Sequence, residues 1–203
     1  MAEVIILPDD YWVYDFSKGV DPDFVCPFAY QIGRYDETRP GMYEHDLFGG
    51  VRNHHVGIDL GAPAGEPVHA FDKGVVFSKG VNSEPGSYGP TIIIQHELDN
   101  KPIWALYGHL STDSLDLVEC GDEVAEGQVI AFVGSKEENG GWEPHVHFQL
   151  SWEEPVDNDL PGVVAIEDRE SALEKYPDPR ICLLYTSDAA DDTPCVDLGG
   201  RRI

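Results

Sequence analysis

The chain has 203 residues, of which 41% are hydrophobic and 10% aromatic, which is enough for the core of one domain. Its 38 acidic residues outnumber 13 basic residues, so the net charge is −25 and the isoelectric point is near 4.3. A surface of this charge repels nucleic acids and anionic membranes, so we expect neither as a partner.

No stretch of the chain is apolar over the length needed to cross a bilayer. The first residues also lack the basic stretch and the cleavage-like site of a secretory signal. A cytoplasmic location is therefore the expectation. The sequence gives no indication of the oligomeric state.

Residues 1–50 are rich in aromatic residues, proline and aspartate, and they show little hydrophobic periodicity. They predict an extended N-terminal arm that carries short strands and has no core of its own. We refer to residues 1–50 as the arm.

Residues 51–155 have a different residue pattern from the arm: short apolar runs alternate with clusters of Gly, Pro, Asn and Asp. Such spacing is typical of an all-β domain. We therefore expect a mainly β fold of antiparallel strands, arranged as a sheet or sandwich. The runs are "HVGIDL", "PVHAF", "GVVFS", "TIIIQHE", "IWALYGHL", "QVIAFVG" and "HVHFQLS".

Residues 156–181 form a C-terminal extension in which one short helix is expected, from Asp168 to Tyr176. Acidic residues occupy its first turn, Lys175 lies in its last turn and Pro177 follows as a stop.

Residues 182–203 back-translate to strings that resemble a transposase-type sequencing adapter. We interpret this segment as a sequencing artefact, expect the authentic protein to be truncated near Ile181, and expect the segment not to pack on the domain. The four cysteines, Cys26, Cys120, Cys182 and Cys195, form no metal-binding CxxC pair and predict no disulfide framework. Cys120 is expected to be a small buried residue.

Two histidines, His145 and His147, are one residue apart in a predicted strand. Residues at positions i and i+2 of a strand project from one face, so both imidazoles aim at the same region. His55 and Asp59 are also separated by an even number of residues, and on one strand they would share a face. Gly57 between them leaves room for a group close to the backbone.

A catalytic zinc site needs three protein ligands and one open position for water. His55, Asp59 and one histidine of the His145–His147 pair supply such a set, and the other histidine and His109 would flank the open position. Zinc lowers the pKa of its bound water to about 7, and a neighbouring imidazole can accept the proton.

Taken together, these motifs resemble those of the LytM/lysostaphin-type zinc metalloendopeptidases. The resemblance implies that His55, Asp59 and His147 bind Zn²⁺ and that His109 and His145 are catalytic. It also implies the antiparallel β fold called the duplicated hybrid motif, and a substrate peptide bond in peptidoglycan, often next to glycine. The matching segments are "HHVGIDLGAPAGEPVHAFDKGVV", "LYGHLS", "GDEVAEGQVIAFVG" and "PHVHFQL".

A narrower resemblance concerns the flanks, which are similar to a peptidase-like domain fused to class III aminotransferases in some bacterial proteins. That domain is cytoplasmic, so the expected substrate is either a peptidoglycan-type peptide or a small cytosolic amide. The arm is expected to pack beside the groove and to restrict which substrates enter. The segments that carry this resemblance include "IGRYDETRPGMY", "ENGGWEPHVHFQL" and "YPDPR".

The alternative function is a non-catalytic binding or regulatory domain of the same fold, within a larger multidomain enzyme. The sequence has all five residues that the resemblance assigns to zinc binding or catalysis, which favours an enzyme. We call these the five motif residues: His55, Asp59, His109, His145 and His147.

Other residues have simpler expected roles. We expect His54 to lie on the surface, and His69 and His96 to be structural or to line the groove wall. For Trp142 and Tyr107 the sequence leaves two alternatives open, contact with the site or packing in the core.

Overall fold

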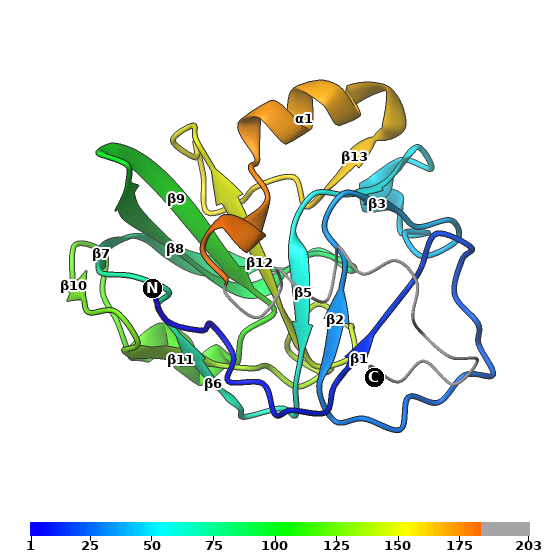
Figure 1. Ribbon diagram of the computed structural model, residues 1–203, viewed down its shortest axis with the longest axis horizontal. Coiled ribbons are helices and arrows are strands. Elements are labelled where there is room, and N and C mark those ends of the chain that lie inside the picture. Colours follow the sequence, from blue (N-terminus) through cyan, green and yellow to red (C-terminus); the bar gives the residue numbers. More distant parts are fainter. Residues whose placement is uncertain (184–203) are drawn as a thin grey trace.

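The computed structural model describes residues 1–183, which form three β-sheets, one α-helix and four short 3-10 helices (Figure 1). The mainly β architecture with one short C-terminal helix confirms the fold class expected from the sequence. The strands are β1 (Trp12–Val13), β2 (Gln31–Gly33), β3 (Glu37–Thr38), β4 (Arg52–His55), β5 (Ile58–Gly61), β6 (Pro67–His69), β7 (Gly74–Asn82), β8 (Gly89–Leu98), β9 (Lys101–Gly108), β10 (Glu123–Val124), β11 (Val129–Phe132), β12 (His145–Ser151) and β13 (Val163–Ala165). The helices are η1 (Asp46–Phe48), η2 (Thr112–Asp116), η3 (Ile166–Asp168), α1 (Arg169–Lys175) and η4 (Pro179–Ile181).

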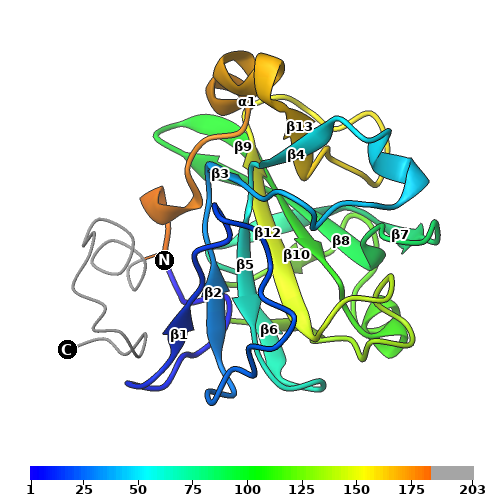
Figure 2. The same cartoon turned by 90° about the vertical axis from the view of Figure 1, so that its right-hand side faces the viewer.

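The largest sheet has eight strands in the order β1-β2-β5-β12-β9-β8-β7-β10, and only the β1–β2 pair is parallel. Strands β5 and β12 therefore lie side by side within it (Figures 1 and 2). A two-stranded sheet pairs β6 with β11, and a three-stranded sheet has the order β13-β4-β3.

The large sheet is buried on both faces at β8, which explains the continuous apolar run in that strand. Ile92 and Ile94 belong to the main core cluster, whereas Ile93 between them belongs to a second cluster. Successive side chains of a strand point to opposite faces, so a strand covered on both sides needs apolar residues at every position. The second cluster includes Ala172 of α1, so the helix covers that face.

A two-residue turn at Asp99 and Asn100 joins β8 to β9, and both residues have positive φ, 52° and 60°. Asp and Asn tolerate the left-handed conformation better than most residues, and turns of this kind match the twist of a hairpin. This hairpin brings β9, which ends next to His109, beside β8 in the sheet.

The arm extends the large sheet, because β2 pairs with β5 and β1 pairs with β2. Val4 and Ile5 of the arm are fully buried in the main core cluster. The arm is thus packed on the domain through a shared core.

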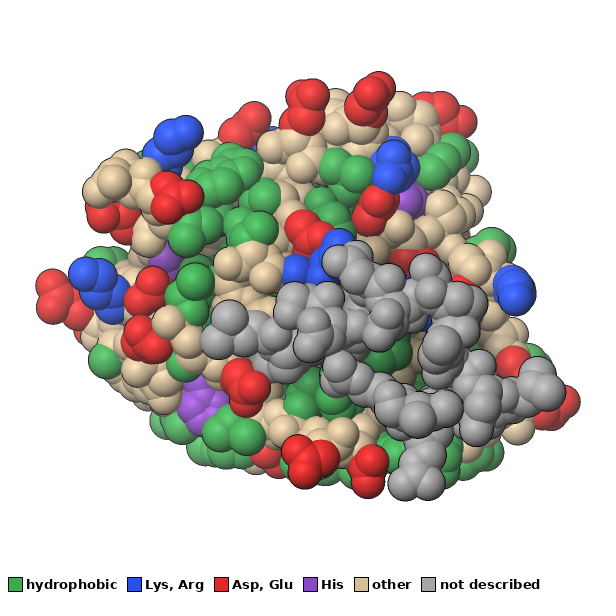
Figure 3. Space-filling view, in the orientation of Figure 1, with side chains coloured by type: hydrophobic (Ala, Val, Ile, Leu, Met, Phe, Trp, Pro, Cys, Tyr) green, Lys and Arg blue, Asp and Glu red, His purple; other side chains and the backbone are tan. Residues whose placement is uncertain are grey.

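The expected helix is present as α1, within one residue of the predicted bounds. Within residues 1–183, none of the helices has the length and hydrophobicity that spanning a bilayer requires. Acidic side chains are spread over much of the face seen in Figure 3, in keeping with the net charge.

Two expectations, one for Cys120 and one for the start of the segment 182–203, were wrong. Cys120 is exposed, because it lies in a turn at the surface. Cys182 and Leu183 are buried in the main core cluster, so these first two residues of the supposed artefact do pack on the domain. The rest of that segment, residues 184–203, lies outside the described residues.

Candidate metal centre

Three side chains, His55, Asp59 and His147, bring one potential ligand atom each to a common point. His55 Nε2 lies 3.1 Å from His147 Nδ1 and 3.2 Å from Asp59 Oδ1. His147 Nδ1 lies 3.0 Å from Asp59 Oδ1. Ligands bound to zinc at about 2.0–2.1 Å in a tetrahedron lie about 3.3 Å apart, so this triangle fits one zinc ion.

The chain brings His55 and Asp59 together by a bend, not along one strand. His55 ends β4 of the three-stranded sheet and Asp59 lies in β5 of the large sheet, and Val56 and Gly57 join the two strands. The assumption of a single strand was therefore wrong. A Cβ atom on Gly57 would lie only 2.4 Å from His147 Cε1, so the close approach expected at this glycine is confirmed.

Asp59 and His147 meet because β5 and β12 are paired. The two residues are direct partners in the antiparallel register, which places their Cβ atoms about 4.5–5.5 Å apart on the same face. His145 projects from the same face of β12, and its Nε2 lies 3.8 Å from Asp59 Oδ1.

Each of the three side chains also has a second partner that fixes its orientation. His55 donates from Nδ1 to Arg34 O at 2.8 Å, and His147 donates from Nε2 to Gln149 Oε1 at 3.0 Å. These bonds leave His55 Nε2 and His147 Nδ1 unprotonated and facing the common point. Asp59 Oδ2 accepts from Arg39 Nη1 at 2.6 Å, which leaves Oδ1 for a metal.

His109 and His145 lie beside this cluster, with ring centroids 4.2 Å apart. His109 donates from Nδ1 to Asn139 O at 2.7 Å, and His145 donates from Nδ1 to Glu143 O at 2.6 Å. In the neutral rings, each Nε2 is then a proton acceptor. His109 has a positive φ of 63°, a conformation that costs a non-glycine residue free energy and often occurs at functional sites.

The pKa values in the cluster favour the forms that bind metal. Burial lowers the pKa of His55 to about 4, with a further contribution from Arg39. Burial alone would raise the pKa of Asp59, but His55 and Arg39 hold it well below its usual range. Asp59 is therefore a carboxylate and His55 is unprotonated, which are the forms that bind zinc.

Burial also lowers the pKa of His109 well below its usual range, with His145 contributing, and burial lowers the pKa of His145. Both rings are therefore neutral at pH 7. Solvent reaches the site mainly past Asp59 and His145, whose side chains are 16% and 18% exposed. The side chains of His55 and His147 are nearly inaccessible.

Several residues at the site were not identified from the sequence. Gln149 lies two residues after His147, so its place on the same strand face was a usable signal. Arg39 and Tyr88 gave no such signal, because they contact the site from outside the motifs. The Tyr88 ring lies 5.1 Å from the His147 ring, and its hydroxyl donates to Leu160 O.

The expectation for His54 was wrong. Its side chain is buried, with its ring nitrogens 2.9 Å from Thr38 Oγ1 and 2.8 Å from Asp36 Oδ1. Strand β4 is the middle strand of its sheet, and His54 is the register partner of Thr38 in β3 and of Val164 in β13, so neighbouring residues flank its side chain on both sides.

His69 and His96 lie away from the cluster. His96 packs on Phe71, with ring centroids 4.2 Å apart, and contributes to the structure as expected. For Tyr107 the structure supports core packing, since its hydroxyl accepts from Phe71 N inside the core.

Trp142 lies near the site, with its ring centroid 6.4 Å from that of His109. Two arm residues contact it: the ring of Tyr43 lies 5.9 Å away and the ring of His45 lies 6.4 Å away. The Trp142 indole also donates to Gly86 O. The arm thus packs next to the site, as expected, whereas its effect on substrates stays a prediction.

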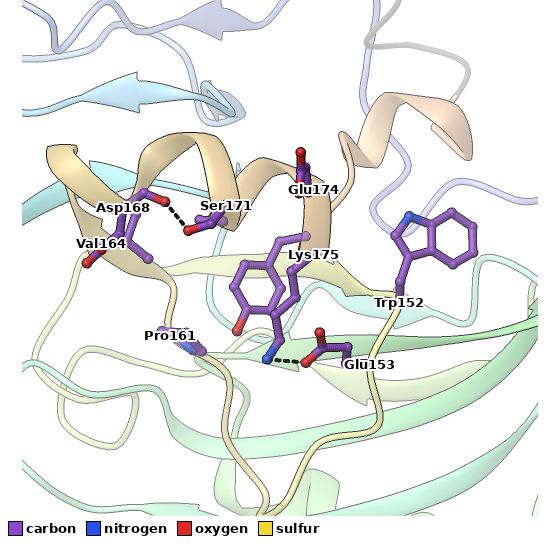
Figure 4. A pocket seen from close by; sticks show the side chains of 10 residues that line it. Trp152, Glu153, Pro161, Val164, Asp168, Ser171, Glu174 and Lys175 are labelled. Carbon is purple, nitrogen blue, oxygen red and sulfur yellow. Dashed lines mark hydrogen bonds and ion pairs between the residues drawn. The ribbon is translucent and has the colours of Figure 1, made fainter.

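A separate hollow lies beneath α1 (Figure 4) and contains none of the five motif residues. The ion pair between Lys175 and Glu153, at 2.5 Å, crosses it. It gives no combination of ligands or nucleophiles, and we assign it no function.

Part of this chain is similar in sequence to a curated protein. The DD-carboxypeptidase/endopeptidase Mpg of Neisseria meningitidis is 39% identical over 95 residues, which is 47% of this chain and 19% of that protein. The aligned part is thus about a fifth of the curated relative. The expected closeness to domains fused to aminotransferases stays a prediction.

Two solved structures are also similar. The catalytic domain of the prophage-encoded M23 protein EnpA from Enterococcus faecalis is 29% identical, with 71% of this chain and 92% of that chain covered and a TM-score of 0.45. The catalytic domain of lysostaphin from Staphylococcus simulans is 22% identical, with 70% and 92% covered and a TM-score of 0.46. The sequence model of Peptidase family M23 matches residues 53–158, more than half of the 203 residues and all five motif positions, and the chain belongs to this family.

Proposed function

We propose that this protein is a zinc-dependent peptidase in which His55, Asp59 and His147 bind the metal. The observation that carries the proposal is the triangle of ligand atoms, 3.0–3.2 Å apart, each belonging to a side chain oriented by a second partner. Two neutral imidazoles beside the opening complete a hydrolytic site.

Zinc, when bound, lowers the pKa of a water molecule and polarises the carbonyl of the scissile bond. The chain's own residues orient the reactants and move the protons. The opening past Asp59 and His145 admits the substrate, and the buried rings of His55, His147 and Tyr88 exclude bulk solvent from behind.

The hydrogen bonds of His109 and His145 define how the proton moves. Because Nδ1 of each ring donates to a backbone carbonyl, each Nε2 begins as an acceptor. One of the two Nε2 atoms accepts the proton of the attacking water and becomes a donor. The imidazolium then stabilises the developing oxyanion and gives the proton to the leaving amine.

We propose a peptide or amide as the substrate, either a peptidoglycan-type peptide or a small amide. The name of the Neisseria relative, a DD-carboxypeptidase/endopeptidase, supports a peptide substrate. The arm residues packed on Trp142, next to His109, favour a short substrate over a cross-linked polymer. No feature of the described residues favours the non-catalytic alternative. The cytoplasmic location stays a prediction.

The proposal is tested by incubating purified, zinc-loaded protein with soluble peptidoglycan fragments and with a panel of small amides, followed by mass spectrometry of the products. His109→Ala serves as the inactive control, and His69→Ala, a histidine away from the site, as the active control. New products that require His109 and not His69 support the proposal. Binding of peptides without any hydrolysis, with zinc present, would favour the binding-domain alternative instead.

A further inference from the structure

Arg39 is a charged side chain buried inside the domain, with only 2% of it exposed. It comes from the arm, outside the region that the family match covers. Its nitrogens each have an acceptor: Nε donates to Glu37 Oε2 at 2.9 Å, Nη1 donates to Asp59 Oδ2 at 2.6 Å and to the Tyr43 hydroxyl at 3.0 Å, and Nη2 donates to Arg34 O at 3.0 Å.

Two of these contacts lead directly to the candidate metal ligands. The guanidinium bonds the Asp59 oxygen that faces away from the two histidines and leaves the other, Oδ1, beside them. Its second contact is Arg34 O, which also accepts the bond from His55 Nδ1. One guanidinium therefore touches Asp59 directly and is linked to His55 through a shared carbonyl.

The surroundings are shaped to allow this contact. Gly33 of β2 is the register partner of Asp59, and a Cβ atom there would lie 2.7 Å from Asp59 Oδ2 and 2.9 Å from Arg39 Nη2. Only glycine leaves space for both groups. The Phe16 ring packs against the guanidinium, with its centroid 5.1 Å from Arg39 Cζ, and shields it from water.

A positive charge next to a metal site would ordinarily weaken the binding of a cation. Here Glu37, also buried, lies on the other side of Arg39 and accepts a further bond from Phe16 N. Glu37 balances the charge of Arg39, so the guanidinium can orient Asp59 without adding net positive charge at the metal. A buried ion pair placed only for stability would not need this arrangement, since apolar residues of similar size often serve as well.

We propose that Arg39 is a positioning residue of the metal centre, which holds Asp59 as a ligand through Oδ1 alone and, through Arg34 O, fixes the orientation of His55. The inference rests on the proposed zinc site. It assigns to the arm a role in metal binding and gives Glu37 the role of counter-charge.

The test compares the wild type with Arg39→Met, Arg39→Lys and Glu37→Gln. The zinc Kd is measured by competition with a chromophoric chelator, and the visible spectrum of the Co²⁺-substituted proteins reports the ligand geometry without any activity assay. Partners of this kind change metal affinity by about 10- to 100-fold, and we expect a loss of this size for Arg39→Met. Glu37→Gln should also weaken binding, and Arg39→Lys should give an altered Co²⁺ spectrum because an ammonium group cannot keep the paired contacts.

Arg169→Met is the matched control, because Arg169 forms a two-nitrogen contact with Asp36 that does not reach the metal ligands. It should keep the wild-type Kd and spectrum. Thermal unfolding of the metal-free proteins shows whether each variant is folded.

The outcomes separate the two proposals. A wild-type protein that binds no zinc contradicts the proposed function itself. A wild type that binds zinc, together with unchanged or tighter binding and an unchanged Co²⁺ spectrum in folded Arg39 variants, overturns the role of Arg39. Loss of folding in both Arg39 variants without metal would also overturn it, since Arg39 would then act on the fold and not on the ligands.

Discussion

The region matched by the family, residues 53–158, and the arm contribute to the same site in different ways. The matched region supplies the three proposed ligands and both neighbouring histidines, each on a strand or directly beside one. The arm supplies Arg39 and the Arg34 carbonyl, which contact the ligands from behind, and Tyr43 and His45, which contact Trp142.

The difference shows that the choice of ligands and their orientation are encoded separately. The pairing of β5 with β12 brings Asp59 and His147 together, and this pairing does not involve the arm residues Arg34 and Arg39. The free oxygen of Asp59 and the ring orientation of His55 depend on contacts from a segment that the family match does not include. Variants in the two regions should therefore fail in different ways.

The largest effect is expected from removal of a ligand in the matched region. His147→Ala leaves two protein ligands, which hold zinc far less well than three, so metal analysis should fall from about one equivalent to near zero and hydrolysis should stop. His54→Ala is the matched control, because His54 is also a buried histidine but points to Asp36 and Thr38. Zinc retained by His147→Ala and by His55→Ala would rule out the ligand assignment.

Replacement of either neighbouring histidine should separate chemistry from metal binding. We expect His109→Ala and His145→Ala to keep one equivalent of zinc and to lose about 10²- to 10⁴-fold in kcat, the usual size of general acid–base catalysis. Steady-state kinetics beside metal analysis checks this. If His145→Ala loses its zinc while His147→Ala keeps it, the roles of the two histidines are reversed.

Substitution of one glycine in the matched region and one in the arm allows a direct comparison of the two regions. Gly57→Ala places a methyl group against His147, and Gly33→Ala places one against Asp59 and Arg39. Each should cost about 1–3 kcal/mol of stability through overpacking, and each should also weaken zinc binding. Gly80→Ala places a methyl group against the Asn158 side chain, away from the candidate ligands, and is the control for unfolding and zinc titrations. A folded Gly33→Ala protein with the zinc affinity of the wild type would show that zinc binding does not depend on the exact positions of Asp59 and Arg39.

Acid should destabilise the matched region through a histidine that has no part in the site. Burial lowers the pKa of His96 to about 4 in the folded protein, against 6.5 when unfolded. The unfolded state binds the extra proton, so this stability is present above pH 6.5 and is lost as the pH falls toward 4, by about 2 kcal/mol between pH 7 and pH 5. His96→Gln, which cannot titrate, should show a shallower decline in urea unfolding. An identical pH dependence in wild type and variant would contradict the shift.

The smallest effect is expected where the arm meets the edge of the site. His45→Ala removes the ring that packs beside Trp142 and Gly86, without touching a ligand. Aromatic contacts of this kind are worth about 0.5–1.5 kcal/mol, so kcat/KM for long substrates relative to short ones should rise by roughly 2- to 10-fold. Zinc content should not change. An unaltered ratio of long to short substrates would show that the arm does not select substrates.

Local patterns were enough to predict the fold class and to single out the histidines and Asp59 as candidates, whereas the role of each of these residues was implied only by the family resemblance. Short apolar runs with turn residues between them predict strands, and the alternation of side chains along a strand places His145 and His147 on one face. The helix at Arg169–Lys175 was predicted from its end signals. Such features depend on neighbours within a few residues, so the sequence alone carries them.

Contacts between distant segments could not be predicted in this way. His54 was expected at the surface because nothing in its sequence surroundings shows that β4 lies between β3 and β13. Arg39 was missed because a charged residue in a polar arm is ordinarily solvated, and its burial depends on acceptors from several segments. The boundaries expected at residues 50, 155 and 181 stay predictions, and the family match spans 53–158.

The sequence by itself determined which residue types are available to hold a metal and move a proton, since these follow from side-chain chemistry and from the two-residue period of a strand. Only the tertiary structure decided how they are presented. His55 and Asp59 lie in two different sheets because the chain bends at Gly57. Hydrogen bonds determine which nitrogen of each imidazole faces the common point, and the guanidinium of Arg39 is buried beside Asp59 Oδ2. The physical reason is that hydrogen-bond partners and burial are set by segments far apart in the chain, and they are defined only when those segments pack together.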